Sequence, residues 1–374
     1  MRTRSRRWPK FLGGALLLVA AFVARTLWSA GAFRRISPHF AGTCREIRGV
    51  VGPEDIVVHP RTRVAYLAGY DRRAAERGEA KPGAIWAWPL DRPDAEPRNL
   101  TPAAGIDFQP HGLGLWLAPA GARDRLFVVN HPAKGSGRPA HTVEAFEIDG
   151  DSLVPVASWS DPDLLVMPND IAPVGPDRFY LTNTHANPRG FAQAVETYLQ
   201  LPRAKVLHFD GARFRPVREG ELFPNGVAAS ADGRRVWIAS TTGREVKEYE
   251  RDAATGDLRY ARSFFVGSGV DNIDVDADGD LWIGSHPNLL AVPALLEDPA
   301  AKSPSQVLRV RPSTGEVEEV FLDDGSRISG SSVGVRVGDR LLVGQIFGES
   351  FLDCTIGRPG PAAGFPFTNR GRSA

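Results

Sequence analysis

Six segments of this 374-residue chain share one pattern, and this repetition constrains the fold more than any other feature of the sequence. Each segment starts with polar side chains, continues as a short alternating strand, turns at Asp, Gly or Pro and returns as an apolar strand. Equivalent positions recur every 47 to 59 residues, at Asp55, His111, Asp170, Asn225, Asn272 and Ser331. The spacing leaves room for two further strands per unit, as a four-stranded propeller blade requires. We therefore predict an all-β fold, a six-bladed β-propeller, with a β-sandwich of ordinary hairpins as the alternative.

The composition agrees with a single folded domain of this kind. The chain is 42% hydrophobic and 24% charged, and its 39 Gly and 30 Pro residues suit a turn-rich β protein. Lys and Arg number 45 against 44 Asp and Glu, so no excess of positive charge favours a nucleic-acid partner. Beyond the N-terminal segment, the candidate helix covers Gly190 to Leu201.

The N-terminus carries an export signal. Five basic residues fall within the first ten positions, and an apolar run of 14 residues follows them, from Phe11 to Ala24. If Arg25 snorkels, the apolar stretch reaches Phe33 and can cross a bilayer; a signal peptide cleaved near residues 30–32 fits as well. Three regions are expected: a signal or signal-anchor helix at 1–35, an extracytoplasmic propeller at 36–354, and a disordered Gly/Pro-rich tail at 355–374.

The chain has two cysteines, Cys44 and Cys354, near opposite ends of the predicted propeller. In an exported protein, such a pair is expected to form a disulfide that joins the first and last strands. For so long a loop, the chain-entropy model gives roughly 5 kcal/mol of stabilisation as an upper figure. Two unpaired thiols are the alternative.

Most of the repeat starts also supply oxygen donors. They are carboxylates and amides, without Cys or clustered His: Glu54, Asp55, Asn169, Asp170, Asn225, Asp271 and Asn272. Such hard donors favour calcium over zinc. The inner strands of a propeller converge on its axis, so these side chains are expected to meet there. Because neighbouring residues on a strand point to opposite faces, one member of each pair could face the channel and the other a second, buried site.

Two other motifs in these repeats are weak. The run from Asp274 to Gly279 begins like an EF-hand loop, but strands flank it and its twelfth position is Ser285 instead of Glu. Residues 330–334 match the G-x-S-x-G elbow of serine hydrolases, yet no strand-to-helix context surrounds them. We expect neither motif to carry the function.

Two of the eight histidines stand out by position. His111 starts the first strand of the second repeat and His131 ends its returning strand, so we expect them at one rim. There, one ring could abstract a proton from water while the other orients it. His185 and His286 occupy corresponding strand ends in two other repeats and could line the same opening. The remaining four are interpreted as surface or strand residues: His39, His59, His141 and His208.

With these motifs in this order, the chain from Cys44 to Cys354 resembles the paraoxonase/arylesterase family, exported six-bladed propellers that hydrolyse esters and lactones with calcium. The resemblance rests on residues 52–55, 108–112, 128–132, 169–171, 223–226, 270–273 and 284–288. It implies two calcium ions, a His111/His131 dyad and a disulfide between the two cysteines. The ligands implied for a catalytic ion are Glu54, Asn169, Asn225, Asp271 and Asn272. Those implied for a structural ion are Asp55, Asp170 and the carbonyl of Leu113.

Some positions depart from the family's pattern. Thr184 stands beside His185 where the family usually has Asp, and Ser285 replaces a free Cys. The segment after Tyr70 is long and polar where the family has a mobile lid. The family commonly keeps its N-terminal hydrophobic segment, which favours a membrane anchor.

From the residues and the resemblance together, we expect a calcium-dependent hydrolase of carboxylic esters, aryl esters or lactones. Calcium would polarise the carbonyl, and His111, oriented by His131, would activate water. A small-molecule ester or lactone and, through the N-terminal segment, a membrane are the expected partners. Two alternatives stay open: a sugar-lactone hydrolase of the gluconolactonase type, and a membrane-tethered binding propeller whose calcium is structural.

Overall fold

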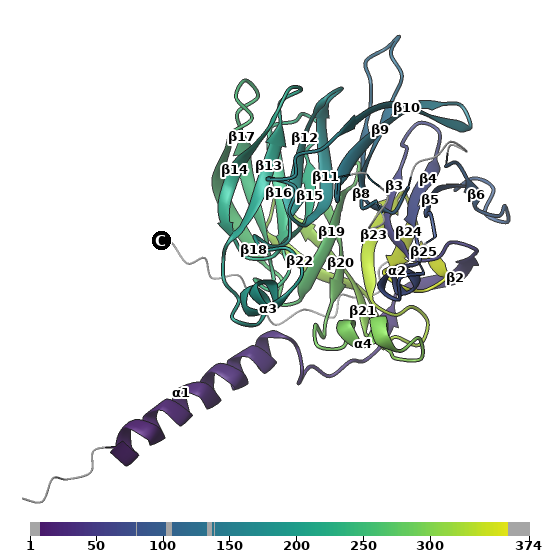
Figure 1. The fold of residues 1–374 in the computed structure, drawn as a ribbon. Helices are drawn as coiled ribbons and strands as arrows, with labels where there is room; N and C mark the ends of the chain where they lie inside the picture. The colour runs from purple at the N-terminus through teal and green to yellow at the C-terminus, as the bar shows by residue number, and fades with distance from the viewer. Residues whose placement is uncertain (1–7, 80, 102–106, 133–136, 138, 358–374) are drawn as a thin grey trace, which may run out of the picture.

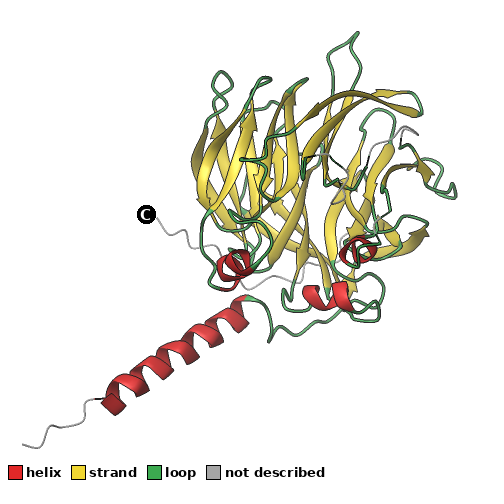
Figure 2. Ribbon diagram, viewed as in Figure 1, coloured by secondary structure: helices red, strands yellow, loops and turns green. Residues whose placement is uncertain are grey.

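A computed structural model of the chain describes residues 8–79, 81–101, 107–132, 137 and 139–357. Most of the predicted tail, residues 358–374, therefore lies outside the described residues. Six antiparallel sheets are arranged as the blades of a propeller, which confirms the predicted fold (Figures 1 and 2). Inner strands of neighbouring blades contact one another around the whole ring.

The blades follow one another along the chain, each built from the axis outward in sequence order. The first blade contains β3 (Pro53–Val58), β4 (Val64–Gly69), β5 (Ala84–Pro89) and β6 (Arg98–Asn99). The second contains β7 (Pro110–Trp116), β8 (Arg125–Asn130), β9 (Thr142–Asp149) and β10 (Ser152–Trp159). The third contains β11 (Pro168–Gly175), β12 (Arg178–Asn183), β13 (Ala204–Phe209) and β14 (Phe214–Glu221). The fourth blade contains β15 (Pro224–Ala229), β16 (Arg235–Ser240), β17 (Glu245–Arg251) and β18 (Leu258–Phe265). The fifth contains β19 (Gly269–Val275), β20 (Leu281–His286), β21 (Ser305–Arg311) and β22 (Glu316–Asp323), and β1 (His39–Phe40) pairs with β22 at the outer edge of this blade.

The sixth blade joins the two ends of the chain. Its inner strands are β23 (Ser331–Val337), β24 (Arg340–Gln345) and β25 (Ser350–Ile356), and its outermost strand is β2 (Gly42–Arg48) from the N-terminal side. Cys44 and Cys354 lie directly opposite each other in the β2–β25 register and form the predicted disulfide. Ring closure therefore combines a strand pairing with a covalent bond.

Apolar side chains fill the space between the blades, because the middle strands are buried on both faces. In β4 and β12, for example, all but one residue are buried. Large rings meet edge to face between blades: Trp88 of the first blade packs on Phe351 of the sixth, with ring centroids 5.4 Å apart. Such packing excludes the apolar residues from the axis and leaves polar side chains there.

The described part of the chain also forms four helices. Three short ones, α2 (Arg72–Glu76), α3 (Phe191–Tyr198) and α4 (Val292–Glu297), lie in the connections β4–β5, β12–β13 and β20–β21. These connections leave the sheets at the face where the inner strands begin, since the strands are antiparallel. Helix α3 falls within the predicted helical stretch. Figure 1 shows all three near the end of the propeller from which α1 extends.

Helix α1 (Trp8–Ser29) projects from the propeller into solvent (Figure 2). Its window Leu12–Ser29 has a mean hydropathy of 1.6 and none of it is buried, so by length and composition this helix can cross a membrane. The helix ends against the loop before α4, where the Leu289 amide donates to the Ala30 carbonyl. The N-terminal segment thus attaches to the same face as the short helices.

Every inner strand is interrupted by a register shift near its start. The shifts lie between Pro53 and Asp55 in β3 and at the corresponding point of β7, β11, β15, β19 and β23. A β-bulge bends the strand and re-aims its side chains, and such bulges are frequent next to active sites. All the oxygen donors predicted to meet at the axis sit at four of these six bulges, those of β3, β11, β15 and β19.

Candidate active site

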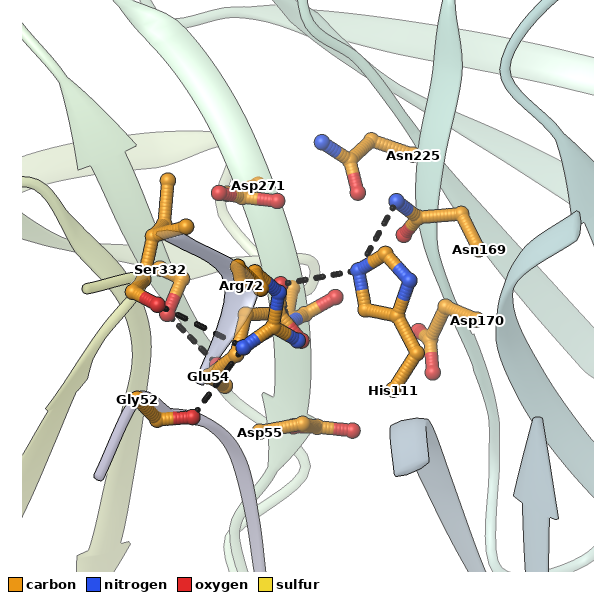
Figure 3. A network of polar contacts seen from close by, with 12 residues as sticks. Gly52, Glu54, Asp55, Arg72, His111, Asn169, Asp170, Asn225, Asp271 and Ser332 are labelled. Atoms are coloured by element: carbon orange, nitrogen blue, oxygen red, sulfur yellow. Dashed lines mark hydrogen bonds and ion pairs between the residues drawn. The ribbon is translucent and has the colours of Figure 1, made fainter. Parts of the chain in front are cut away.

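The predicted calcium ligands do gather at the axis. Their side chains come from four inner strands, β3, β11, β15 and β19, and each is buried, with at most 8% of its surface exposed: Glu54, Asn169, Asn225, Asp271 and Asn272. Figure 3 shows the labelled members facing one another across the propeller. Residues separated by up to 218 positions in sequence are in direct contact, because the Asn272 Nδ2 lies 3.2 Å from the Glu54 Oε1.

Close backbone packing makes this convergence feasible. A Cβ added at Gly112 of β7 would lie 2.4 Å from the Asn169 carbonyl oxygen, and one at Gly226 of β15 would lie 2.4 Å from the Asp271 carbonyl oxygen. Only glycine leaves room for neighbouring inner strands to approach so closely. The glycine that follows His111 or Asn225 in sequence therefore brings the next strand's donors to the axis.

Four of these side chains have an oxygen that accepts no hydrogen bond from the described residues. The atoms are Glu54 Oε2, Asn169 Oδ1, Asn225 Oδ1 and Asn272 Oδ1, and all four are buried. A buried polar atom without a partner costs about 1–3 kcal/mol, so four in one place indicate a missing cationic or polar partner. Carboxylate and amide oxygens are the ligands that calcium takes. The donor set thus fits the ion that the sequence predicted.

The two carboxylates of this set differ in their surroundings. Burial raises the pKa of Glu54, but the charge and hydrogen bond of His111 and the charge of Arg72 outweigh it and bring the pKa to about 2. Burial raises the pKa of Asp271, against the hydrogen bond from His286, whose Nε2 lies 2.8 Å from the Asp271 Oδ2. His286 thereby orients a predicted ligand, as the partners of metal-binding carboxylates commonly do.

The residues predicted for a second ion connect adjacent blades. Asp55 accepts the amides of Ile56 on its own strand and Leu113 on β7, at 2.8 and 2.6 Å. Asp170 accepts in the same way from Ile171 and from Val227 on β15, at 2.7 Å each. Burial and nearby carboxylates raise the pKa of both well above its usual value.

No three His, Cys, Asp or Glu side chains among the described residues form a metal-ligand group by themselves. This agrees with the composition of the set at the axis, in which three amides accompany two carboxylates. The structural role predicted for Asp55, Asp170 and the Leu113 carbonyl remains a prediction, as does the number of ions.

The two histidines chosen from the sequence lie in contact. His111 Nδ1 is 2.8 Å from His131 Nε2. On its other side, His111 Nε2 lies 3.5 Å from both the Glu54 Oε1 and the Asn169 Nδ2, so it borders the polar ring (Figure 3). Burial, together with the charges of His111, His141 and Arg72, holds the pKa of His131 well below its usual value. His131 is therefore neutral near pH 7.

The interpretation of His141 as a surface or strand residue is wrong. It precedes β9, is only partly exposed, and its Nδ1 lies 2.8 Å from the Nδ1 of His131. Sequence reasoning missed it because it stands at the start of a third strand, outside the register that marked the other site residues. Of the other three, His39 is exposed, whereas His59 and His208 are buried.

Arg72 is a second site residue that the sequence did not single out. It is the first residue of α2, in the segment predicted to be a lid, and it stacks on Tyr70 with its guanidinium carbon 4.6 Å from the ring centroid. One of its nitrogens donates to the Gly52 carbonyl at 3.1 Å, and another lies 3.8 Å from the Glu54 Oε2 (Figure 3). A cation therefore covers one side of the ring.

The remaining candidates are structural. His185 contacts Thr184 and Thr197 through its two ring nitrogens and packs against Phe223, so it does not reach the ring. Ser332, in the G-x-S-x-G match, donates to the Glu54 carbonyl and fixes the strand that carries that ligand. In the EF-hand-like run, the carboxylate of Asp276 accepts a hydrogen bond from the indole N–H of Trp282. Neither motif therefore forms the site that its sequence suggested.

The fold and the site together define a six-bladed β-propeller whose buried polar side chains gather on its axis. The family model for arylesterase matches residues 75–356. Serum paraoxonase/arylesterase 2 of Gallus gallus is 31% identical over 90% of this chain and 97% of its own length, and serum paraoxonase/arylesterase 1 of Homo sapiens is 31% identical over 87% and 92%. The chain belongs to the arylesterase family. It is an enzyme, a propeller hydrolase of carboxylic esters.

Solved structures show the same fold at lower identity. A luciferin-regenerating enzyme superposes with a TM-score of 0.53 at 12% identity, covering 84% of this chain and 95% of its own. A putative gluconolactonase does so with a TM-score of 0.53 at 16% identity, covering 86% and 94%. These likenesses show the six-bladed architecture alone.

Proposed function

We propose that this protein is a calcium-dependent lactonase and aryl esterase whose reaction takes place at the polar ring on the propeller axis. The observation that carries the proposal is the set of four buried oxygens without hydrogen-bond donors beside His111. When bound there, calcium supplies a Lewis acid for the carbonyl oxygen of the substrate. Glu54 and Asp271 bring two negative charges, which balance a divalent ion.

The histidines supply the proton transfer. His111 Nε2, at the border of the ring, accepts a proton from a water molecule as the water oxygen bonds to the carbonyl carbon. The carbon–oxygen bond of the ester or lactone then breaks, and the departing oxygen takes up the proton held by His111. Throughout, His131 holds the Nδ1 side of His111 at 2.8 Å. A general base of this kind contributes typically 10²- to 10⁴-fold to the rate.

Two variants separate binding from catalysis. His111→Gln should lower kcat by roughly 10²- to 10⁴-fold and leave calcium bound, since its ring is not in the ligand set. Asn225→Ala should remove calcium and activity together, whereas Asn225→Asp, which keeps an oxygen donor, should retain both in part. The measurements are hydrolysis of a panel of aryl esters, aliphatic lactones and sugar lactones, and calcium content after dialysis.

The outcomes distinguish the alternatives. Hydrolysis that persists undiminished after chelation contradicts the calcium-dependent scheme. Turnover confined to sugar lactones favours the alternative of a sugar-lactone hydrolase of the gluconolactonase type. Thermal stabilisation by calcium without any turnover on the panel contradicts a hydrolytic site at the axis and favours a structural ion.

We also propose that α1 anchors the propeller on the outer side of a membrane. The disulfide requires an oxidising compartment, and the basic residues before α1 favour the cytoplasmic side for the extreme N-terminus. Fractionation of cells that express the full chain tests this. The protein should stay with membranes after a salt wash and be degraded by protease added outside, and a soluble cytoplasmic enzyme would contradict it.

A further inference from the structure

The guanidinium of Arg72 lies beside the polar ring and has a nitrogen without a partner. Its Nη1 donates to the Gly52 carbonyl at 3.1 Å and to the Ile346 carbonyl at 3.4 Å. Its carbon lies 4.6 Å from the centroid of the Tyr70 aromatic ring. Its Nη2 is buried and has no hydrogen-bond partner among the described residues, because the Glu54 Oε2 is 3.8 Å away (Figure 3). Backbone carbonyls and an aromatic ring therefore hold the guanidinium in place, and one of its donors stays free.

Other residues attach α2, the helix of Arg72, to the propeller. Arg73 donates to the carbonyls of Leu295 and Phe347, at 2.7 and 2.9 Å. At the other end of the helix, Glu76 forms an ion pair with Arg189 in the β12–α3 connection. The helix is thus held on both sides by contacts that do not involve Arg72. Fixing the helix does not account for a free guanidinium nitrogen at the ring.

Arg72 also lacks a carboxylate of its own. The neighbouring Asp71 accepts the Ala74 amide at 2.9 Å, so its carboxylate caps α2. Within the described part of the chain, the one ion pair of Arg72 is with Glu54. The Oε2 of Glu54 is one of the four buried oxygens proposed above to hold calcium. When Glu54 and Asp271 balance a divalent ion, the charge of Arg72 is left without a counter-ion.

This charge stands where it opposes the proposed ion. A cation beside a cation site costs Coulomb energy, and local features that work against their own surroundings are typical of functional positions. A guanidinium with a free N–H group binds a carboxylate through charge-assisted hydrogen bonds, which are about twice as strong as neutral ones. An anionic group that arrives with the substrate supplies the counter-ion that the protein does not provide.

The position of Arg72 suits contact with a substrate. The side chains of Arg72 and His111 are 11% and 20% exposed, whereas that of Glu54 is 4% exposed, so solvent reaches the ring past the first two. Both flank the same carboxylate: His111 Nε2 lies 3.5 Å from the Glu54 Oε1, and Arg72 Nη2 lies 3.8 Å from the Oε2. When the reacting carbonyl lies beside His111, a substituent a few bonds away is therefore close to Arg72.

We propose that Arg72 binds a carboxylate of the substrate through Nη2, so that the enzyme prefers lactones or esters that carry a carboxylate a few bonds from the bond that is hydrolysed. This inference rests on the proposed function, which places the reacting carbonyl beside His111. Arg72 determines specificity and takes no part in the proton transfer.

Kinetics with a matched pair of substrates test the preference. The pair is a five-membered lactone with a carboxylate on its ring and the same lactone with a carboxamide in that place, which is similar in shape and uncharged. The measured quantity is the ratio of kcat/KM for the carboxylate to kcat/KM for the carboxamide. From the parent to Arg72→Gln, this ratio should fall by roughly 10- to 100-fold, the range for a hydrogen bond between charged groups.

Two further variants serve as controls. Arg72→Lys keeps the charge and should retain part of the ratio. Arg77→Gln removes an exposed arginine from the same segment and should leave the ratio as it is in the parent. All proteins are assayed at a calcium concentration that saturates each of them, because a charge beside Glu54 also affects the affinity for the ion.

Binding without turnover gives a second readout. Cyclopentanecarboxylate and cyclopentanecarboxamide match the lactones in ring size and contain no ester bond, and isothermal titration calorimetry measures their binding to the calcium-loaded protein. The carboxylate should bind to the parent roughly 10- to 100-fold more tightly than to Arg72→Gln, and the carboxamide should bind to both with similar affinity. Equal carboxylate affinity in the two proteins would overturn the inference, since the carboxylate would then bind elsewhere, for example directly to the ion. No measurable binding to the parent would overturn it as well.

Failure of this inference is distinguishable from failure of the proposed function. If the calcium-loaded parent hydrolyses neither lactones nor aryl esters, the proposed function is contradicted, and calorimetry still decides whether Arg72 binds a carboxylate. If the parent hydrolyses both lactones and the ratio is unchanged in Arg72→Gln, the preference for an anionic substrate is refuted and the hydrolase stands. An equal fall of the ratio in Arg77→Gln also refutes it, because the effect would then come from net charge and not from Arg72.

Discussion

Breaking the Cys44–Cys354 disulfide should lower stability and leave catalysis unchanged. The bond joins residues 310 positions apart. For a loop of that length the chain-entropy model gives about 5.7 kcal/mol at 25 °C, slightly above the rounded figure of roughly 5 kcal/mol expected from the sequence. This term acts on the unfolded chain, because the native ends are also held by the β2–β25 pairing from Gly42 to Arg48. With an unfolding entropy of about 2 cal/mol/K per residue over roughly 320 residues, the melting temperature should fall by about 9 °C.

The assay is thermal and urea unfolding of the Cys44→Ala/Cys354→Ala double variant beside the parent. Parent protein reduced with a thiol is the matched control, because reduction cuts the bond without removing either sulfur atom. Both samples should lose stability to a similar extent, and kcat and calcium affinity should match those of the oxidised parent. A melting temperature unchanged in both samples would refute the loop-entropy reasoning. A loss of kcat in the folded double variant would show that the bond, and not the strand pairing, holds the ring in place.

Three further perturbations test other parts of the structure. Burial and the charges of three arginines lower the pKa of His208 to about 4. The unfolded chain therefore takes up a proton first as pH falls below 6.5, which should cost about 2 kcal/mol of stability between pH 8 and pH 5, and His208→Phe should remove that part of the pH dependence in urea unfolding. Gly226→Ala places a Cβ 2.4 Å from a carbonyl oxygen of β19 and should reduce both calcium content and kcat, while Gly175→Ala, which meets only ordinary contacts, should change neither. Arg72→Met removes a positive charge 3.8 Å from the Glu54 carboxylate and should tighten calcium binding by roughly tenfold in a titration; weaker binding would contradict the charge argument.

The fold was predictable because the sequence repeats its own pattern. Each unit restates the same polar start and the same hairpin, so the phase of the six repeats identifies the residues that begin the inner strands. The cysteine pairing followed from two residues at the ends of a closed ring, and the structure shows them in register. Strand phase alone was therefore enough to bring Glu54 and Asn272 together, although 218 residues separate them.

Strand alternation was an accurate guide for two of the three polar pairs. It predicted that one member of a pair faces the channel and the other a second, buried site. Glu54 and Asn169 lie in the polar ring, whereas their neighbours Asp55 and Asp170 accept backbone amides of the adjacent blade. The third pair, Asp271 and Asn272, lies within the bulge between Val270 and Ile273 of β19, and both of its members belong to the ring. The sequence around these positions offers Gly112 and Gly226 as a signal, since a glycine within a strand indicates a bulge or a close backbone approach.

The contact between His131 and His141 shows where repeat phase stops being informative. His111 and His131 stand at the ends of two paired strands, and their position in the repeat is enough to place them together. His141 stands at the start of the next strand, and its contact with His131 depends on a connection whose course no periodicity specifies. A contact that depends on the course of a loop cannot be read from residue identities and their position in a repeat, so the third histidine was found only in the structure.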